Sequence, residues 1–359
     1  MMDILRNQER AIFRLRELYR GFGYLPYRMS RFEEYDLYVR NKDFLVSQEI
    51  ITFADRSGRL LALKPDVTLS IIKNAPSGAG VVQKLYYNEN VYRVDKGTHT
   101  FREIMQAGLE CVGDLGEYEI VETLLLAVKS LQLLGSWFVL NLSHMGLISA
   151  VLSGSGLSED AAREAAEFLQ QKSLHSLADL CERQGVPGEK LLLLAQLRGS
   201  AAEVIPPLAE ILTTPEEKQA LEQLRGICDT LADQGYGDAV QVDFSVGSDL
   251  KYYSGVVFRG YLEGIPQSVL SGGQYDRLLR RMGKKGSAIG FAVNVDLLQR
   301  QEKQSSEVDT LILHDPDVSP ARILAAMEQA GKEGTVLVAQ SVPADRSFKK
   351  LVELKGETE

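Results

Sequence analysis

The sequence has little that could hold a metal ion or a disulfide framework. It contains three cysteines and four histidines in 359 residues, and Cys111, Cys181 and Cys228 stand far apart with no CxxC pair. Disulfide frameworks and zinc sites need paired or closely spaced ligands, and no two histidines have metal-ligand spacing. We therefore expect no metal, no cofactor and three reduced, buried thiols, which favours a cytoplasmic protein.

Long apolar runs and an excess of basic residues are missing too. Stretches such as 124–128 and 191–195 fall far short of the roughly 20 residues that cross a membrane, and the charged first ten residues lack the apolar core of a signal peptide. Lys and Arg number 40 against 49 Asp and Glu, for a formal net charge of −9. Because nonspecific nucleic-acid binding needs clustered cations, we expect neither a nucleic acid nor a membrane as partner.

The common catalytic motifs are also absent. There is no GxxxxGK[ST] phosphate loop, since the Gly283–Ser287 segment has the wrong spacing, and no complete GxGxxG. There is no GxSxG nucleophile elbow. The sequence therefore offers no catalytic residue by motif alone.

The patterns that are present predict an α+β fold with a mostly antiparallel sheet. Long connections separate the expected strands, whereas a doubly wound sheet alternates strands and helices regularly. We expect one domain over 1–307 with a helical insert at about 150–238, broken at 185–188, at Pro206-Pro207 and at Pro215, and a short βαβ-like α/β segment over 308–359. The expected elements are helices at 3–22, 65–74 and 117–134, a hairpin at 50–64, and strands at 81–94, 101–112, 137–142, 240–246, 253–260, 267–271 and 287–293.

The expected strand at 104–112 carries the strongest sign of a binding site. Side chains alternate across a strand, so Gln106, Gly108 and Glu110 share one face. A glycine between two polar side chains lets a ligand lie against the backbone. The alternate residues form a set suited to a core: Met105, Ala107, Leu109 and Cys111. A half-solvated strand with an incidental glycine is the alternative.

Three further segments could converge on this strand: Lys64–Thr68, Tyr252–Gly255 and Ser271–Asp276. Together they offer acids, an amide, phenols and a glycine-rich turn, which suit an ammonium or imidazole ligand. Asp66 and Glu110 could hold an α-ammonium group by charge-assisted hydrogen bonds. Each segment alone is also consistent with a strand-edge turn or a helix cap.

In this order the segments resemble histidyl-tRNA synthetase, a class II aminoacyl-tRNA synthetase, over about residues 1–300. The resemblance implies a class II synthetase-like antiparallel sheet flanked by helices. The matching segments are Thr52–Gly58 and Leu63–Thr68, similar to the family's TFEDR.G hairpin and LRPE.T motif; Val91–Asp95 and 101–113, similar to motif 2 and its return strand; Tyr252–Phe258 and Ser271–Asp276, similar to the two histidine signatures; and Ala288–Ala292, similar to the start of motif 3.

Two departures from the family decide what the resemblance implies about activity. Leu297 stands where motif 3 supplies an arginine for ATP, and Ser248 stands where the histidine signature has an arginine. Such cations stabilise charge that develops as the carboxylate attacks the α-phosphate, and each can contribute about 3 kcal/mol. We therefore expect no aminoacyl-adenylate formation, and residues 308–359 are too few for an anticodon-binding domain.

The residues that would hold the amino acid are largely retained. A chain with a histidine-sized pocket but without the catalytic cations resembles the regulatory subunit of ATP phosphoribosyltransferase, and Asn141–Gly146 and Gly255–Gly260 point to the same family. By matched motif the histidine-binding residues are Asp66, Thr68, Arg93, Gln106, Glu110, Tyr253 and Tyr275, with Gly108, Gly272 and Gly273 as supporting backbone.

This resemblance implies a non-catalytic subunit that dimerises with itself and joins the short-form catalytic subunit in a hetero-octamer. The complex would carry out the first step of histidine biosynthesis, condensation of ATP with phosphoribosyl diphosphate, under feedback inhibition by histidine. Histidine could bind in the synthetase-like pocket or at a subunit interface. A truncated histidyl-tRNA synthetase-like ligase and a stand-alone histidine sensor are the alternatives.

Overall fold

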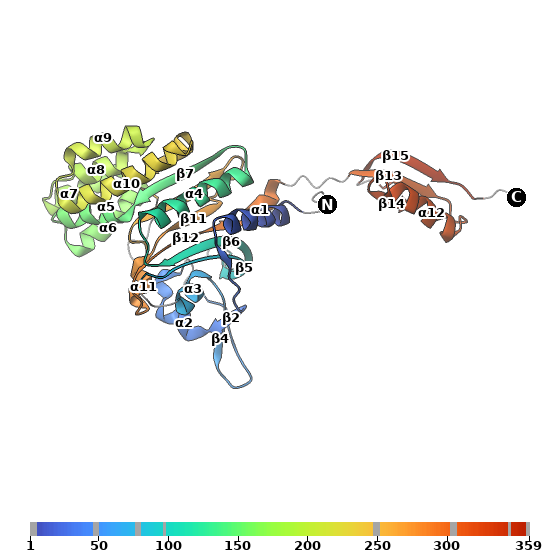
Figure 1. Cartoon of the computed structure of the whole chain (residues 1–359), viewed down its shortest axis with the longest axis horizontal. Coiled ribbons are helices and arrows are strands. Elements are labelled where there is room, and N and C mark those ends of the chain that lie inside the picture. Colours follow the sequence, from blue (N-terminus) through green and yellow to red (C-terminus); the bar gives the residue numbers. More distant parts are fainter. Residues whose placement is uncertain are drawn as a thin grey trace. The chain divides into compact units, whose positions relative to one another are not determined.

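The computed structural model describes residues 6–45, 50–75, 80–95, 98–246, 252–301, 307–343 and 346–356, and Ser248 lies outside them. The chain divides into two compact units, Met1–Gln299 and Arg300–Glu359. Each unit is described separately, and Figure 1 labels their elements.

In the described part of the first unit, nine strands form one sheet in the order β1-β5-β6-β12-β11-β10-β7-β9-β8. All neighbouring pairs are antiparallel except β1–β5 and β7–β9. The predicted mostly antiparallel α+β fold is therefore confirmed. The strands are β1 (Leu25–Pro26), β5 (Val82–Val94), β6 (Phe101–Gly113), β12 (Ser287–Asn294), β11 (Leu270–Gln274), β10 (Val256–Leu262), β7 (Phe138–His144), β9 (Val240–Asp243) and β8 (Arg198–Gly199).

Helices and a small second sheet flank the two faces of this sheet (Figure 1). The side chains of β6 alternate between two hydrophobic cores. Leu109 and Cys111 are fully buried in the larger core with α1 and α4, whereas Val112 packs in a smaller core with α3 and α11. The flanking elements are α1 (Asn7–Gly21) and α4 (Glu117–Leu134) for the larger core, and α2 (Tyr35–Arg40), α3 (Thr68–Asn74), α11 (Asp276–Arg281), β2 (Phe32–Glu34), β3 (Thr52–Ala54) and β4 (Leu60–Leu63) for the smaller one.

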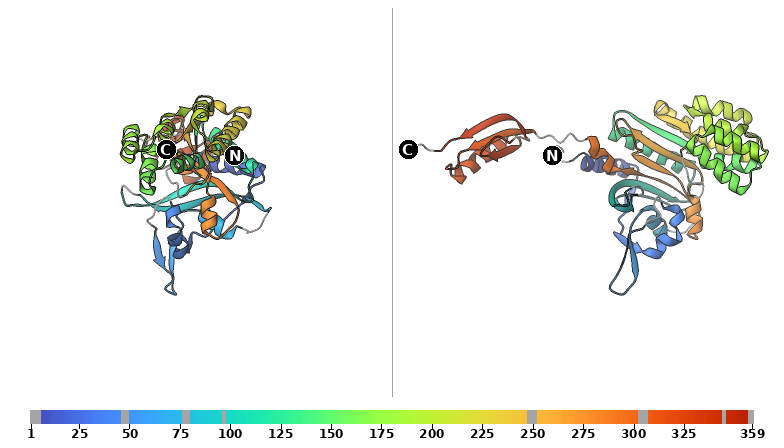
Figure 2. Two further views of the ribbon diagram at one scale, coloured as in Figure 1. Left: turned by 90° about the vertical axis from the view of Figure 1, so that its left-hand side faces the viewer. Right: turned by 180° about the vertical axis from the view of Figure 1, so that it is seen from behind.

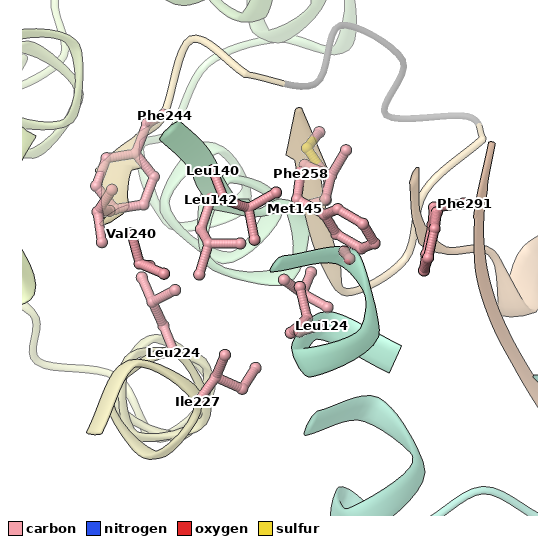
Figure 3. Close-up of a cluster of buried hydrophobic side chains, with 14 of the residues drawn as sticks. Leu124, Leu140, Leu142, Met145, Leu224, Ile227, Val240, Phe244, Phe258 and Phe291 are labelled. Carbon is pink, nitrogen blue, oxygen red and sulfur yellow. The ribbon is translucent and has the colours of Figure 1, made fainter. Parts of the chain in front are cut away.

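A group of helices follows β7 and gathers at one end of the sheet (Figures 1 and 2). Figure 3 shows how it joins the core, with Leu224 and Ile227 of one helix near Leu140 and Leu142 of β7. No helix in the described residues is long and apolar enough to cross a membrane. The group comprises α5 (Met145–Gly154), α6 (Glu159–Gln171), α7 (Leu174–Gln184), α8 (Glu189–Gln196), α9 (Ala201–Ile211) and α10 (Pro215–Asp233).

Two local predictions are wrong. Pro206 and Pro207 do not break the chain but lie inside α9, because the Ser200–Glu203 capping box and the buried side chains of Val204, Ile205 and Leu208 stabilise the helix around them.

The strand predicted over 240–246 is also shorter than its alternation indicates, since β9 ends at Asp243. Asp243 Oδ1 accepts hydrogen bonds from the Ser245 backbone N–H at 3.0 Å and from its hydroxyl at 2.6 Å. This local turn takes over from the strand.

The second unit contains the predicted strand–helix–strand segment and one more strand. Its sheet is parallel in the order β14-β13-β15, with Leu311 and Ile312 fully buried. The additional strand was missed because Lys349 and Lys350 interrupt its alternation. The elements are β13 (Glu307–His314), α12 (Pro320–Gly331), β14 (Val336–Ala339) and β15 (Ser347–Leu354).

Candidate functional site

The candidate site is built around Glu110 on β6, whose side chain is almost completely buried. One carboxylate oxygen accepts a hydrogen bond from Thr68 Oγ1 at 2.6 Å, and the other accepts one from the Tyr275 hydroxyl. Burial raises the pKa of Glu110 to about 8, although these two hydrogen bonds oppose the shift. At neutral pH most molecules of the free protein therefore hold this carboxyl group protonated.

A second acid, the partly buried Asp66, lies on the loop that enters α3. Its Oδ1 accepts a hydrogen bond from the Leu69 backbone N–H at 3.0 Å. Burial raises the pKa of Asp66, against the opposing effects of that hydrogen bond and of the Arg93 guanidinium. Arg93 Nε donates to the Pro65 carbonyl at 3.0 Å, so one loop positions both the acid and the cation.

Tyrosines enclose the two acids. The Tyr252 ring lies 5.9 Å from Tyr275 and 4.5 Å from Tyr253, between ring centroids. Burial raises the pKa of Tyr87, Tyr252 and Tyr275 well above the usual value. Their hydroxyls are therefore neutral hydrogen-bond donors over the physiological range.

Tyr87 and Tyr252 were not among the site residues predicted from the sequence, whereas Tyr253 was. In the β5–β6 register Tyr87 is paired with Gly108, and a Cβ atom added at Gly108 would lie 2.6 Å from the Tyr87 hydroxyl. An aromatic residue opposite a glycine on the neighbouring strand could have indicated Tyr87 as a site residue. Recognising this pair, however, requires the register of the two strands.

Glycines allow the close packing beneath the site. A Cβ atom at Gly273 would lie 2.6 Å from the Tyr253 ring, and one at Gly272 would collide with the Gly290 carbonyl and the Phe291 side chain. One at Gly290 would collide with the Glu110 carboxylate. Gly290 lies in the motif 3-like segment but was not predicted as part of the site.

Gln106 lies on the same face of β6 as Glu110, on the far side of Gly108. It is buried, and the strand register pairs it with Asn294 on β12 and Glu89 on β5. Glu89 forms an ion pair with Lys64, whose side chain is also buried. The structure thus brings Asp66, Thr68, Glu110 and Tyr275 into one cluster with Arg93 close by, and it places Gln106 two strand positions beyond Gly108.

The motif 3 position carries apolar packing instead of a cation. Leu297 is buried in the larger core. The preceding residue, Asp296, accepts hydrogen bonds from Gln8 Nε2 at 2.9 Å and from the Met105 backbone N–H at 3.0 Å. These hydrogen bonds therefore connect the segment that follows β12 to α1 and to β6.

Comparison with known proteins gives a consistent family. The model of the histidyl-tRNA synthetase family matches residues 3–298. The ATP phosphoribosyltransferase regulatory subunit of Caldanaerobacter subterraneus subsp. tengcongensis is 30% identical over 301 residues, which cover 81% of this chain and 78% of that protein.

Two solved structures share the fold. A protein from Bacillus halodurans C described as an ATP phosphoribosyltransferase regulatory subunit/histidyl-tRNA synthetase has a TM-score of 0.79 at 24% identity, covering 99% of this chain and 97% of that one. A chain of the ATP phosphoribosyl transferase complex from Thermotoga maritima has a TM-score of 0.65 at 17% identity, covering 82% and 98%.

Proposed function

The chain belongs to the histidyl-tRNA synthetase-like family, among the regulatory subunits of ATP phosphoribosyltransferase, and from this premise we propose that its buried acidic site binds histidine. It is a non-catalytic subunit that serves histidine biosynthesis with a catalytic partner. Occupation of the site by histidine would inhibit phosphoribosyl transfer by that partner.

The observation that carries the histidine proposal is the pair of neighbouring acids, the buried Glu110 and the partly buried Asp66. Burial of two neighbouring carboxyl groups disfavours their charged forms, and a cation placed between them restores ionisation. The α-ammonium group of histidine supplies that cation through charge-assisted hydrogen bonds.

The remaining groups suit the rest of the amino acid. The Arg93 guanidinium has donors beyond the Nε atom that contacts Pro65, and these suit the α-carboxylate. The hydroxyls of Tyr253 and Tyr275 and the amide of Gln106 supply donors and acceptors for an imidazole ring.

The proposed absence of adenylate chemistry is supported by the motif 3 position. Leu297 packs in the larger core and itself carries no positive charge for a phosphate, whereas adenylate formation depends on such charge. We assign no role in transferring histidine to tRNA.

For the assembly, we propose a dimer of this chain joined to the short-form catalytic subunit in a hetero-octamer, in the cytoplasm, with no nucleic acid or membrane as partner. The three cysteines are free and buried, as in a reducing compartment. Inhibition requires that histidine bind one state of the assembly more tightly than the other, and the coupling must be reciprocal.

The proposal is tested by calorimetric titration of histidine into the purified chain, alone and with its catalytic partner. We expect saturable binding by the chain alone, with affinity changed by the partner. Binding that requires the partner would place histidine at a subunit interface instead. Histidine-dependent pyrophosphate exchange by the chain alone would support the ligase alternative and overturn the non-catalytic assignment.

A further inference from the structure

Two short helices bring the hydrogen-bond donors of the Glu110 site together. Thr68, the first residue of α3, donates to one oxygen of the Glu110 carboxyl group at 2.6 Å. Tyr275, the residue immediately before α11, donates to the other oxygen. Both helices pack in the smaller core, α3 through Ile72 and α11 through Leu278. The spacing between the starts of α3 and α11 therefore fixes how closely the two hydroxyls approach the carboxyl group.

The turn that ends α11 fixes the position of the lysine that follows it. Gly283 has a φ of 73°, and its N–H donates to the Arg280 carbonyl at 3.0 Å. The N–H of Lys284 donates to the Leu279 carbonyl at 2.9 Å. These two bonds and the left-handed glycine form a Schellman motif. Because other residues are strained in this conformation, Gly283 determines where the chain leaves the helix and where Lys284 lies.

Lys284 contacts the C-terminal end of α3. Its Nζ donates to the Lys73 carbonyl at 3.0 Å and also to the Ala75 carbonyl. The last carbonyls of a helix have no partner within the helix, and a cation is favoured beside them. Burial lowers the pKa of Lys284, as expected for an ammonium group partly withdrawn from water. The two helices are therefore joined twice, at their starts through Glu110 and at their ends through Lys284.

Two neighbouring cations differ from Lys284 in their surroundings. Arg281 ends α11, and its Nη2 donates to the Arg40 carbonyl at 2.8 Å. That carbonyl belongs to the last residue of α2, a helix that carries no residue of the proposed histidine site. Lys285 follows Lys284 directly and is exposed. Lys285 is therefore a matched control for the loss of one positive charge in this turn.

We propose that Lys284 is a positioning residue of the Glu110 site. By holding the end of α3 against the end of α11, it sets the spacing between Thr68 and Tyr275. Without this contact the starts of the two helices separate, and the hydrogen bonds to the carboxyl group weaken. The consequence for histidine binding rests on the proposed function, whereas the consequence for the hydrogen bonds does not.

Urea unfolding tests the positioning without any ligand. Thr68→Val removes the hydroxyl that bonds Glu110 and keeps the shape of the side chain, so it should lower the free energy of unfolding. In the Lys284→Met background the same change should lower it by only about half as much, because the hydrogen bond is already weakened. In the Lys285→Met background the loss should equal that in the unaltered chain. Equal losses in all three backgrounds would overturn the proposal, since changes at independent sites are additive.

Calorimetric titration of histidine into the full chain tests the consequence for binding. We expect about fivefold weaker affinity in Lys284→Met. Affinity should stay within about twofold of the unaltered chain in Lys285→Met, and also in Lys284→Arg, whose guanidinium keeps donors for the two carbonyls. Equal affinity in Lys284→Met and Lys285→Met would overturn the proposal. If the unaltered chain binds no histidine, the proposed function fails, and the unfolding measurements alone decide the role of Lys284.

Discussion

Removing the Glu110 carboxyl group should change how the stability of the free protein depends on pH. The pKa of Glu110 is about 8 in the folded protein against 4.5 for an ordinary glutamate. A raised pKa means that its contribution to stability is fully present below pH 4.5 and is lost as the pH rises to 8. The loss amounts to about 1.4 kcal/mol per pH unit, or about 3 kcal/mol by pH 7, a large share of the stability of an ordinary domain.

Glu110→Gln keeps the shape of the side chain but does not titrate. Its free energy of unfolding, minus that of the unaltered chain, should therefore increase between about pH 5 and 8 and level off above pH 8. Urea unfolding measured across this range gives the difference, and any constant cost of the new amide does not alter the slope. Glu103→Gln, which removes an exposed carboxyl from the same strand, is the control. Parallel pH profiles for Glu110→Gln and the unaltered chain would refute the assignment of a protonated, buried Glu110.

Three further predictions concern the same unit. Tyr275→Phe removes the hydrogen bond to Glu110 and should weaken inhibition of the complex by histidine about tenfold. Sedimentation should show that the assembly of the complex is unaffected. Inhibition equal to that of the unaltered complex would exclude Tyr275 from the site. Gly108→Ala forces a Cβ atom against the Tyr87 ring and the Phe291 carbonyl and should lower the free energy of unfolding by about 1–3 kcal/mol, measured with urea. Leu297→Arg should lower stability by at least about 2 kcal/mol without producing pyrophosphate exchange, because the position is buried among apolar side chains; exchange activity in this variant would show that the site lacks only this cation.

Local sequence patterns predicted part of the fold correctly. The parts that were missed depend on contacts between segments that are distant in the sequence. Alternation along β6 correctly separated Leu109 and Cys111, in the larger core, from Glu110. Tyr87 was missed because its place opposite Gly108 follows from strand register, which a single strand does not encode. The protonated state of Glu110 was equally out of reach, because it results from burial by several segments together.

The raised pKa of Glu110 also bears on why such a site suits regulation. A ligand cation that needs the ionised carboxylate can bind only the fraction of molecules in which Glu110 has lost its proton. With a pKa of about 8 this fraction is about one tenth at pH 7, so the apparent affinity is about tenfold below the intrinsic one. If the site binds histidine as proposed, this lower affinity raises the histidine concentration at which inhibition begins. Binding should release close to one proton per site at pH 7 and less above pH 8. Calorimetry in buffers of different ionisation enthalpy measures this release, and proton-neutral binding at pH 7 would show that the cation does not meet Glu110.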